Sequence, residues 1–427
     1  MAFNLLIFLY LSFTYLPPTP SIGSMKVFRE SARLFVPEEA NGGKVSSHTK
    51  RGTNQSCSKS IVFFGIREFW FTFCNYERFS HYKYLVRFPR SFECPEVNCR
   101  LTIGYTKEPR YIGAYDIVVF TNVNRWLSKK EWVWVQGNRT KGQRWVMVTE
   151  ESPLYAPGFQ PPEMYSAVTF DWFGSYKQDS DFFHPYGIYT PFEEGDPVPD
   201  LDADAIFKSK PKLLAWMGSH CKTQQWDRLR FVETFSKLVR VDRYGKCGNG
   251  TFVQWNNDTA VKEAIGPYKF YLSLENSCCR DYITEKFWRT LQMGSVPIVV
   301  GPPLEDYKKL APPNSFIHPD QFDNLVDMAT HILEVAGDRS KYLEYFQWKK
   351  KGKIFVYSQE EYYIRPLTNE SNCAILKKFL RSDETHQEKL DYFGPRWYQS
   401  CVPCGHRDFL KSYMHNKNHS ISDNLWE

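Results

Sequence analysis

The chain has 427 residues, of which 42% are hydrophobic and 17% aromatic, so it is long enough for two domains with large apolar cores. Its formal net charge is only +6, and its lysines and arginines are spread along the sequence. No basic run is dense enough to indicate a nucleic-acid-binding face, and this mild positive balance fits small anionic ligands equally well. We therefore expect a globular protein that has no nucleic-acid partner.

An apolar block, residues 2–16 (AFNLLIFLYLSFTYL), lies near the start of the chain and is followed by two prolines. It is shorter than the roughly twenty residues of a membrane span and long for the core of a signal peptide. We expect residues 1–20 to be an uncleaved signal-anchor, with a cleaved signal peptide as the alternative. Either one would direct the rest of the chain into the lumen of the secretory pathway.

Sequons for N-glycosylation agree with a luminal compartment. There are six Asn-x-Ser/Thr sites, which begin at Asn54, Asn138, Asn249, Asn257, Asn369 and Asn418. Each of them would make the membrane-attached chain a glycoprotein.

The eleven cysteines make an odd number, so at least one is expected to lack an intramolecular partner. Cys401-Val-Pro-Cys404 resembles half of a zinc site or a redox motif, but a second CxxC or a His pair at zinc spacing is missing. In an oxidising lumen a structural disulfide between Cys401 and Cys404 is the better interpretation. Cys94 and Cys99 are a second candidate pair.

Residues 21–60 are polar and lack a sustained period, which predicts a stem or linker. A first α/β domain is predicted over residues 61–195, with strands at residues 61–66, 116–121, 145–149 and 167–172. The acidic, proline-containing stretch between residues 192 and 205 is the best candidate for a domain boundary.

Strands and helices alternate in the second half of the chain, which predicts another doubly wound parallel sheet over residues 205–365. The predicted strands are residues 212–217, 240–244, 269–274 and 296–300, and the predicted helices are residues 227–239, 285–293 and 322–335. Residues 366–427 are predicted to form a cysteine-containing tail that packs back on the body.

The stretch 268–301 indicates a ligand site most strongly. It reads as a buried strand, a polar loop, a helix that opens on Thr-Glu-Lys, and a second buried strand. Open α/β sheets bind ligands at the carboxyl ends of their strands, and the free N–H groups of a following helix favour an anion there. With Lys286 in the first turn of that helix, the pattern predicts a nucleotide-sugar site. The loop contributes Glu275, Asn276, Asp281 and Tyr282.

The segments FYLSLENS, DYITEKFW and GSVPIVVGPP of this stretch closely resemble the donor-binding signature of the α-1,3-fucosyltransferases, and further similarity extends over about residues 99–404. The resemblance implies a GT-B architecture, in which two Rossmann-like doubly wound domains hold the active site in the cleft between them. It also implies an inverting, metal-independent transfer of L-fucose. GDP-fucose would then be the co-substrate, and no cofactor or essential metal is expected.

Glu151 follows an apolar strand and precedes Ser152-Pro153. A carboxylate at the carboxyl end of a strand is well placed to take a proton from an acceptor hydroxyl. The segment RWVMVTEESP resembles the strand of the family that ends in Glu-Ser-Pro, whose Glu is the proposed base. The resemblance therefore implies that Glu151 is the catalytic base, with its neighbour Glu150 as the alternative.

Lys286 and Arg228 are expected to bind the pyrophosphate of the donor, because cationic groups stabilise the charge of a leaving phosphate. Arg230 is the alternative to Arg228, because the segment before it departs from the family pattern by two extra residues. In the absence of a ligand role, these side chains would be ordinary residues of a solvated surface.

Four more residues are expected at the donor. Glu285 would accept a hydrogen bond from a ribose hydroxyl, with helix capping as the alternative role. Asn276 and Tyr282 would add neutral hydrogen bonds to phosphate or ribose. Tyr244, in a turn with Gly245 that resembles the Tyr-Gly turn of the family, would let the backbone approach the nucleotide.

Two Asp-x-Asp pairs invite a metal interpretation: Asp179 with Asp181, and Asp202 with Asp204. The first lies in a segment that resembles a metal-independent part of the family fold, and the second lies in the acidic linker. We therefore expect no metal site.

The acceptor side departs from the family. Its common lactosamine-modifying members carry a His-His-Arg stretch where this chain has Thr121-Asn122-Val123-Asn124. Two acceptors are therefore considered, N-acetylglucosamine of a glycoprotein glycan in α-1,3 linkage and, alternatively, Ser or Thr of a folded luminal or secreted protein. A catalytically silent luminal GDP-sugar-binding protein is an alternative of another class. In each case we expect a single-pass type II protein of the Golgi or endoplasmic reticulum membrane.

Overall fold

The structure is a computed structural model. It describes residues 57–65, 83–85, 87–121, 129–154, 169–219, 221, 225–248, 253–254, 257–358, 364–382, 390–391, 394–404 and 407–413. All of them belong to one unit, Gly52–Glu427. The expected signal-anchor, most of the expected stem, and Asn54, Asn249 and Asn418 lie outside the described residues. No helix within the described ranges is long and apolar enough to cross a membrane.

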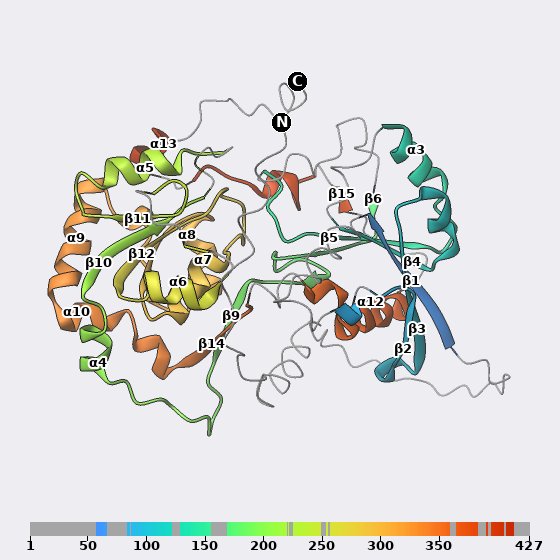
Figure 1. Cartoon of the computed structure of the whole chain (residues 1–427), viewed down its shortest axis with the longest axis horizontal. Helices are drawn as coiled ribbons and strands as arrows, with labels where there is room; N and C mark the ends of the chain where they lie inside the picture. Colours follow the sequence, from blue (N-terminus) through green and yellow to red (C-terminus); the bar gives the residue numbers. More distant parts are fainter. Residues whose placement is uncertain are drawn as a thin grey trace, which may run out of the picture. The chain divides into compact units, whose positions relative to one another are not determined.

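The first half of this unit contains a seven-stranded sheet in the order β2-β3-β1-β4-β5-β7-β8 (Figure 1). All neighbours are parallel except the edge pair β2 and β3. Every side chain of β4 and β5 is buried, as expected for strands that are covered on both faces. The strands are β1 (Cys57–Gly65), β2 (Arg90–Cys94), β3 (Cys99–Thr106), β4 (Ile117–Thr121), β5 (Arg144–Val148), β7 (Trp172–Ser175) and β8 (Phe182–Phe183).

Helices from distant parts of the chain cover the two faces of this sheet. On one face, Trp132 of α3 (Lys129–Gly137) packs in the same cluster as Val62. On the other face, Leu376 of α12 (Asn369–Arg381) packs in the same cluster as Ile61. Ile61 and Val62 fall in different clusters because successive side chains of a strand point to opposite faces. The predicted tail thus supplies a helix to the first sheet.

The second half contains a four-stranded parallel sheet in the order β11-β10-β12-β13. The strand order reverses between β10 and β12, and doubly wound sheets bind ligands beyond the carboxyl ends of the strands at such a point. The strands are β10 (Lys212–Met217), β11 (Asp242–Tyr244), β12 (Tyr268–Leu274) and β13 (Val296–Val300). Two α/β sheets, the second parallel throughout and the first parallel except at the edge pair β2–β3, confirm the predicted α/β class.

The helices of the second half also lie on both faces of their sheet. Leu214 packs in a cluster with α5, α9 and α10, whereas its neighbour Ala215 packs with α6. Phe287 of α7 belongs to neither of these clusters. It lies in the cluster of Trp132 and Val62 described above, so one hydrophobic core joins both halves. The helices are α4 (Ala203–Lys208), α5 (Arg228–Phe235), α6 (Asp258–Ile265), α7 (Glu285–Gln292), α8 (Leu304–Leu310), α9 (Leu325–Gly337), α10 (Arg339–Glu344) and α13 (Asp408–Lys411).

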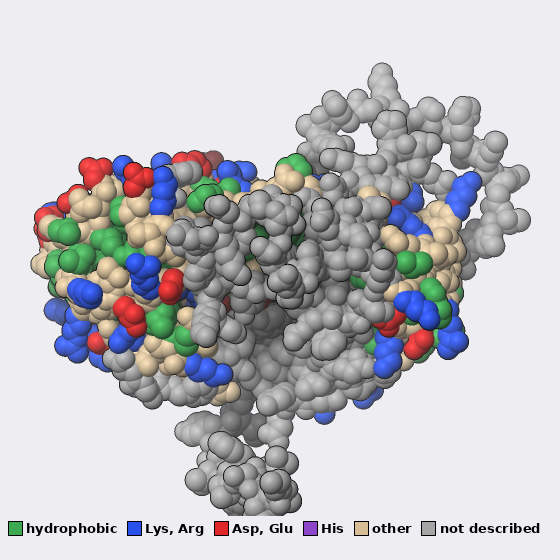
Figure 2. Space-filling view, turned by 90° about the horizontal axis from the view of Figure 1, so that it is seen from above, with side chains coloured by type: hydrophobic (Ala, Val, Ile, Leu, Met, Phe, Trp, Pro, Cys, Tyr) green, Lys and Arg blue, Asp and Glu red, His purple; other side chains and the backbone are tan. Residues whose placement is uncertain are grey.

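Two small antiparallel pairs connect segments that are far apart in sequence. β9 (Gly187–Pro191) pairs with β14 (Gly352–Val356), and β6 (Thr169–Phe170) pairs with β15 (Leu390–Asp391). On the face shown in Figure 2, the lysines and arginines of the described residues are interspersed with aspartates and glutamates.

Disulfides correct the predicted cysteine pairing. Cys401 bonds to Cys279 and Cys404 bonds to Cys278, so the predicted bridge within Cys401-Val-Pro-Cys404 is wrong. The reason is that Cys279 and Cys401 lie opposite each other in an antiparallel β-bridge, which leaves Cys404 for Cys278. The predicted pairing of Cys94 with Cys99 is also wrong. The remaining bridges are Cys57–Cys99, Cys94–Cys373 and Cys221–Cys247, and the eleventh cysteine, Cys74, lies outside the described residues.

Candidate active site

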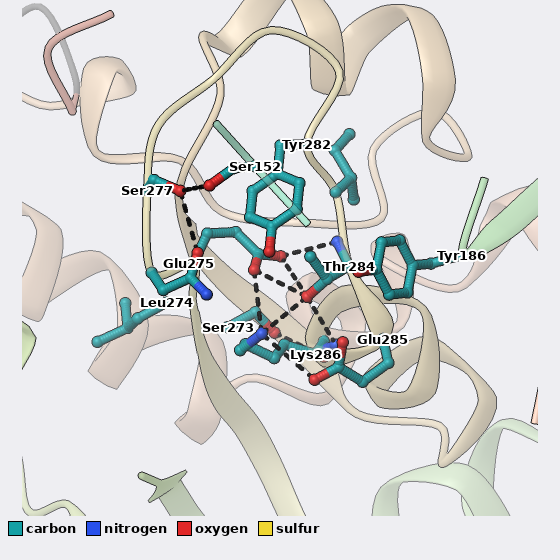
Figure 3. Close-up of polar contacts among 12 residues, drawn as sticks. Ser152, Tyr186, Ser273, Leu274, Glu275, Ser277, Tyr282, Thr284, Glu285 and Lys286 are labelled. Carbon is teal, nitrogen blue, oxygen red and sulfur yellow. Dashed lines mark hydrogen bonds and ion pairs between the residues drawn. The ribbon is translucent and has the colours of Figure 1, made fainter. Parts of the chain in front are cut away.

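A fully buried carboxylate, Glu275, follows β12 directly (Figure 3). It accepts hydrogen bonds from the backbone N–H and the side-chain hydroxyl of Thr284, both at 2.8 Å. Thr284 is the N-cap of α7, so this carboxylate lies at the positive end of the helix dipole. The sequence pointed to Glu275 as a loop residue but gave it no role, and Thr284 was missed except as the start of the helix.

Lys286 lies between two carboxylates. Its Nζ is 3.2 Å from Glu275 Oε2 and 3.3 Å from Glu285 Oε1, and it donates to Thr284 Oγ1 at 2.9 Å. Burial and the nearby Arg228 lower the pKa of Lys286, but the two carboxylates outweigh them, so this pKa is raised above its ordinary value. Lys286 therefore stays charged throughout the physiological pH range.

The two carboxyls around Lys286 differ in their titration. Burial raises the pKa of Glu275, against the opposing effect of Lys286. Burial acts in the same direction on Glu285, but Lys286 and Arg289 outweigh it and hold the pKa of Glu285 below its ordinary value. Glu285 is therefore ionised at neutral pH and able to accept a hydrogen bond.

Glu151 lies just beyond β5 and is connected to this cluster by Tyr282, whose hydroxyl donates to Glu151 Oε2 at 2.8 Å. Burial raises the pKa of Glu151 to about 7, while the hydrogen bond from Tyr282 and the charge of Lys286 act in the opposite direction. A carboxyl with a pKa near 7 can take up a proton from a reacting group at neutral pH.

Glu150, the alternative base, is also buried, and burial together with the charge of Glu151 raises its pKa to about 7. The two glutamates have different surroundings. The charges of Lys286 and Glu285 act on Glu151, whereas the cation that acts on Glu150 is Arg365. Of the two carboxyls, Glu151 is thus the one on which the charges of Lys286 and Glu285 act.

Arg228 is the first residue of α5 and is buried. Its Nη1 donates to the carbonyl of Leu274 at 3.2 Å, so its guanidinium lies at the carboxyl end of β12. Arg230, the alternative, is exposed and contacts the carbonyl of Ser412 at 3.3 Å. The structure therefore brings Arg228 together with Lys286 and directs Arg230 toward the C-terminal segment.

Asn276 is buried beside Glu275, and its Oδ1 accepts a hydrogen bond from the hydroxyl of Ser277 at 3.0 Å. The same hydroxyl contacts Ser152 Oγ, next to Glu151 (Figure 3). The sequence did not indicate this contact, because the two serines are 125 residues apart.

Tyr244 lies apart from this cluster, at the end of the edge strand β11. Its hydroxyl is 2.8 Å from that of Tyr268. Gly245 has a φ of +81°, and a Cβ at this position would lie 2.4 Å from the carbonyl oxygen of Gly218. The space that the missing side chain of Gly245 leaves is thus occupied by the backbone of Gly218.

The Asp-x-Asp pairs contact basic side chains. Asp181 pairs with Lys378 at 3.1 Å, and Asp204 pairs with Arg339 at 2.6 Å. Within the described ranges, no three His, Cys, Asp or Glu side chains are grouped so that they could hold a metal ion. Three sequons are described: Asn138 follows α3, Asn257 caps α6, and Asn369 begins α12.

Two family models match most of the chain. The model described as "Glycosyltransferase family 10 (fucosyltransferase) C-term" matches residues 207–392, and "Fucosyltransferase, N-terminal" matches residues 69–187. Alpha-(1,3)-fucosyltransferase 7 of Bos taurus is 33% identical over 298 residues, which are 69% of this chain and 78% of that protein. The chain therefore belongs to glycosyltransferase family 10, the fucosyltransferases.

Other relatives are matched over a smaller share of their length. Alpha-(1,3)-fucosyltransferase 4 of Bos taurus is 37% identical over 223 residues, which are 52% of this chain and 54% of that protein. The human protein of the same name is 36% identical, and the match spans 40% of it. The chain thus spans about half the length of these relatives. A crystal structure of an alpha1,3-fucosyltransferase matches with a TM-score of 0.49 at 18% identity, over 79% of this chain and 94% of the other.

Proposed function

We propose that this chain transfers L-fucose from GDP-fucose, with inversion, to N-acetylglucosamine of a glycoprotein glycan in α-1,3 linkage. Membership of family 10 supports the reaction. The acceptor is supported by the name of a human relative with 36% identity, 4-galactosyl-N-acetylglucosaminide 3-alpha-L-fucosyltransferase FUT5. The observation that carries the proposal is the contact between Glu151, a carboxyl with a pKa near 7, and a loop that leads to the cation Lys286.

The proposed step begins with the acceptor hydroxyl. Its oxygen attacks the anomeric carbon of fucose while the carboxylate of Glu151 takes its proton. The bond between that carbon and the β-phosphate oxygen breaks, and GDP leaves with the bonding electrons, through a transition state that resembles an oxocarbenium ion. Lys286 and Arg228 would stabilise the negative charge that develops on the diphosphate.

In this proposal the remaining donor residues bind the nucleotide. Glu285 is ionised at neutral pH and would accept a ribose hydroxyl, which fits its position beside Lys286. Asn276 and Tyr282, from the loop between β12 and α7, would add neutral hydrogen bonds to phosphate or ribose. Tyr244, on β11, lies apart from these residues, and the resemblance of its turn with Gly245 is what supports a part in nucleotide binding.

We also propose that the chain works in the lumen of the Golgi or the endoplasmic reticulum, anchored by its N-terminal segment. The five disulfides among the described residues support an oxidising compartment.

The purified chain should be incubated with labelled GDP-fucose and three acceptors. They are a glycoprotein with N-acetylglucosamine-containing glycans, the same protein after enzymatic removal of its glycans, and a set of folded proteins without glycans. We expect label on the first acceptor alone. Label on the glycan-free proteins would instead show transfer to Ser or Thr, and GDP binding without transfer to any acceptor would indicate a silent binding protein.

The matched variant is Glu151→Gln, which keeps the shape of the side chain and removes the base. It should transfer fucose at least ~100-fold more slowly while it binds GDP as the unaltered chain does. Near-normal turnover in this variant would exclude Glu151 as the base, and the same measurement on Glu150→Gln would test the alternative.

A further inference from the structure

Three hydroxyl groups from elsewhere in the chain hold the short segment that contains the proposed base. The contacts are Tyr186 OH to the carbonyl of Glu150 at 2.8 Å, Tyr282 OH to Glu151 Oε2 at 2.8 Å, and Ser277 Oγ to Ser152 Oγ. Among these three, the contact from Tyr282 is the one to a carboxylate. The other two act on the backbone or on the neighbouring serine, so they do not touch the proposed base itself.

The direction of the Tyr282 hydroxyl is fixed by packing. Tyr282 is 1% exposed, and its ring centroid lies 4.8 Å from that of Tyr176 and 6.4 Å from that of Tyr186. Its backbone N–H donates to the carbonyl of Cys279 at 3.1 Å, and Cys279 is bonded to Cys401. A phenol held in this way has little freedom to turn from Glu151 toward another partner.

We propose that Tyr282 is a positioning residue for the base: its hydroxyl fixes the orientation of the Glu151 carboxylate and favours its ionised form. This inference rests on the proposed function, and it gives Tyr282 a role on the acceptor side of the reaction in place of one in donor binding. The hydroxyl binds one carboxylate oxygen and leaves the other for the proton of the acceptor.

The Tyr282 hydroxyl is one of several groups that act on the pKa of Glu151. Lys286 favours the carboxylate, whereas the carboxyls of Glu285 and Glu275 disfavour it. The neighbouring carboxyl of Glu150 is coupled to Glu151, and Arg365 acts on Glu150. The hydrogen bond from Tyr282 lowers the pKa of Glu151 against the larger effect of burial. Removal of the hydroxyl should therefore raise this pKa and reduce the fraction of base that is ionised at neutral pH.

The experiment compares two tyrosine-to-phenylalanine variants of the full chain. Tyr282→Phe keeps the ring and removes the hydroxyl from the carboxylate of Glu151. Tyr186→Phe, the matched control, removes a buried hydroxyl from the same segment but not from that carboxylate. The measurement is kcat/KM for fucose transfer from pH 5 to pH 9. At low pH, kcat/KM falls as the base becomes protonated, and this acid limb of the pH profile reports the pKa of Glu151. In Tyr282→Phe the acid limb should move up by about one pH unit, the size expected for the loss of a hydrogen bond to a charged group.

The acid limb of Tyr186→Phe should coincide with that of the unaltered chain, even if its rate is lower at every pH. An unmoved limb in Tyr282→Phe would overturn the inference, and so would equal shifts in both variants. A rise in the KM for GDP-fucose without a shift would make Tyr282 a donor-binding residue instead.

A second measurement separates this inference from the proposed function. Infrared difference titration of the carboxyl groups, with Glu151→Gln to identify the band, reports the pKa of Glu151 without turnover. If the chain transfers no fucose but the pKa of Glu151 rises in Tyr282→Phe, the proposed function is refuted and the pairing of Tyr282 with Glu151 stands. If the chain transfers fucose but this pKa does not change, the proposed function stands and the pairing is refuted.

A different observation concerns the outer surface of α3. Val133 and Trp134 are each 55% exposed, and Trp134 lies one turn before the sequon at Asn138. Asn138 Nδ2 donates to the carbonyl of Trp134 at 2.7 Å. Asn138 directly follows α3, and this bond turns its side chain back onto the last turn of the helix, so a sugar attached to this nitrogen would lie near Trp134.

We infer that Asn138 carries an N-glycan whose first N-acetylglucosamine packs on Trp134. The occupant is the chain's own glycan, because the attachment nitrogen is bonded to the backbone of Trp134 itself. The contact would cover part of an aromatic side chain that is 55% exposed and has Lys130 Nζ 5.7 Å from its ring centroid.

Mass spectrometry of the glycosylated chain should find Asn138 occupied. Trp134→Ala should lower the melting temperature by about 1 °C in the glycosylated chain and leave it unchanged in an Asn138→Gln background. An empty Asn138, or the same change in both backgrounds, would refute the inference.

Discussion

Lys286→Met tests the charge cluster beyond β12. Methionine keeps the length of the side chain and removes the cation, so the fully buried Glu275 retains its bonds to Thr284 but loses an ion pair of 3.2 Å. At pH 7 the unpaired carboxylate of Glu275 can become neutral by taking up a proton. An ordinary glutamate has a pKa of about 4.3, roughly 2.7 pH units below pH 7, and each unit costs about 1.36 kcal/mol, so protonation costs about 3.7 kcal/mol.

That figure is an upper limit, and removal of one partner of a buried ion pair costs about 3–5 kcal/mol in general. Lys286 is 23% exposed and the bonds to Thr284 remain, so we expect a loss of about 2–3 kcal/mol in the free energy of unfolding at pH 7. In the variant the folded chain binds a proton that the unfolded chain lacks, so its stability falls as pH rises. At pH 5 proton uptake costs only about 1 kcal/mol, and the loss should shrink accordingly.

The assay is urea unfolding at pH 5 and pH 7, followed by tryptophan fluorescence. Lys308→Met, at an exposed position of α8, is the matched control and should change stability by less than about 0.5 kcal/mol. Adding Glu275→Gln to Lys286→Met should recover most of the loss at pH 7. An unchanged midpoint for Lys286→Met, or a larger loss at pH 5 than at pH 7, would show that the pair does not act as described.

Three further outcomes are expected. Lys286→Met should bind GDP about ten- to a hundredfold more weakly by calorimetry while guanosine binds equally, because a charge-assisted hydrogen bond contributes about 1.5–3 kcal/mol; EDTA should not change this result. Gly245→Ala should unfold about 1–3 kcal/mol more easily, because its φ is +81° and its Cβ would meet Gly218; an equal urea midpoint would contradict this. Peptide mapping without reduction should link Cys94 to Cys373, and a peptide that links Cys94 to Cys99 would contradict the structure.

Strands that are buried on both faces could be predicted closely. The predicted residues 212–217 and 296–300 coincide with β10, whose residues 214–216 are buried, and with β13, which is buried throughout, since both contain continuous apolar runs. β2 was missed because it is a short edge strand with alternating burial. The helix predicted over residues 227–239 ends at Phe235, where the hydroxyl of the next residue, Ser236, bonds to the carbonyl of Val232 and the chain turns.

The candidate site divides in the same way. Glu285 and Lys286 are neighbours in the first turn of α7, so a local pattern sufficed to propose both as ligand residues, whereas it gave Glu275 of the same stretch no role. The resemblance pointed to Glu151, but the contacts that depend on tertiary folding, such as those of Tyr282 with Glu151 and of Ser277 with Ser152, were not predictable. The short spacing of Cys401-Val-Pro-Cys404 led to a wrong disulfide prediction, because a β-bridge that the sequence does not reveal places Cys279 opposite Cys401.

The electrostatic effect of Lys286 on Glu151 couples the two halves of the proposed reaction. Lys286 lowers the pKa of Glu151 while it is paired only with protein carboxylates. A bound diphosphate would add negative charge beside Lys286 and weaken that effect, so the pKa of Glu151 should rise when the donor binds. The acid limb of kcat, which reports the bound enzyme, should then lie at higher pH than the limb of kcat/KM, which reports the free enzyme. Coincident limbs would mean that the charge of the donor is not felt at the base.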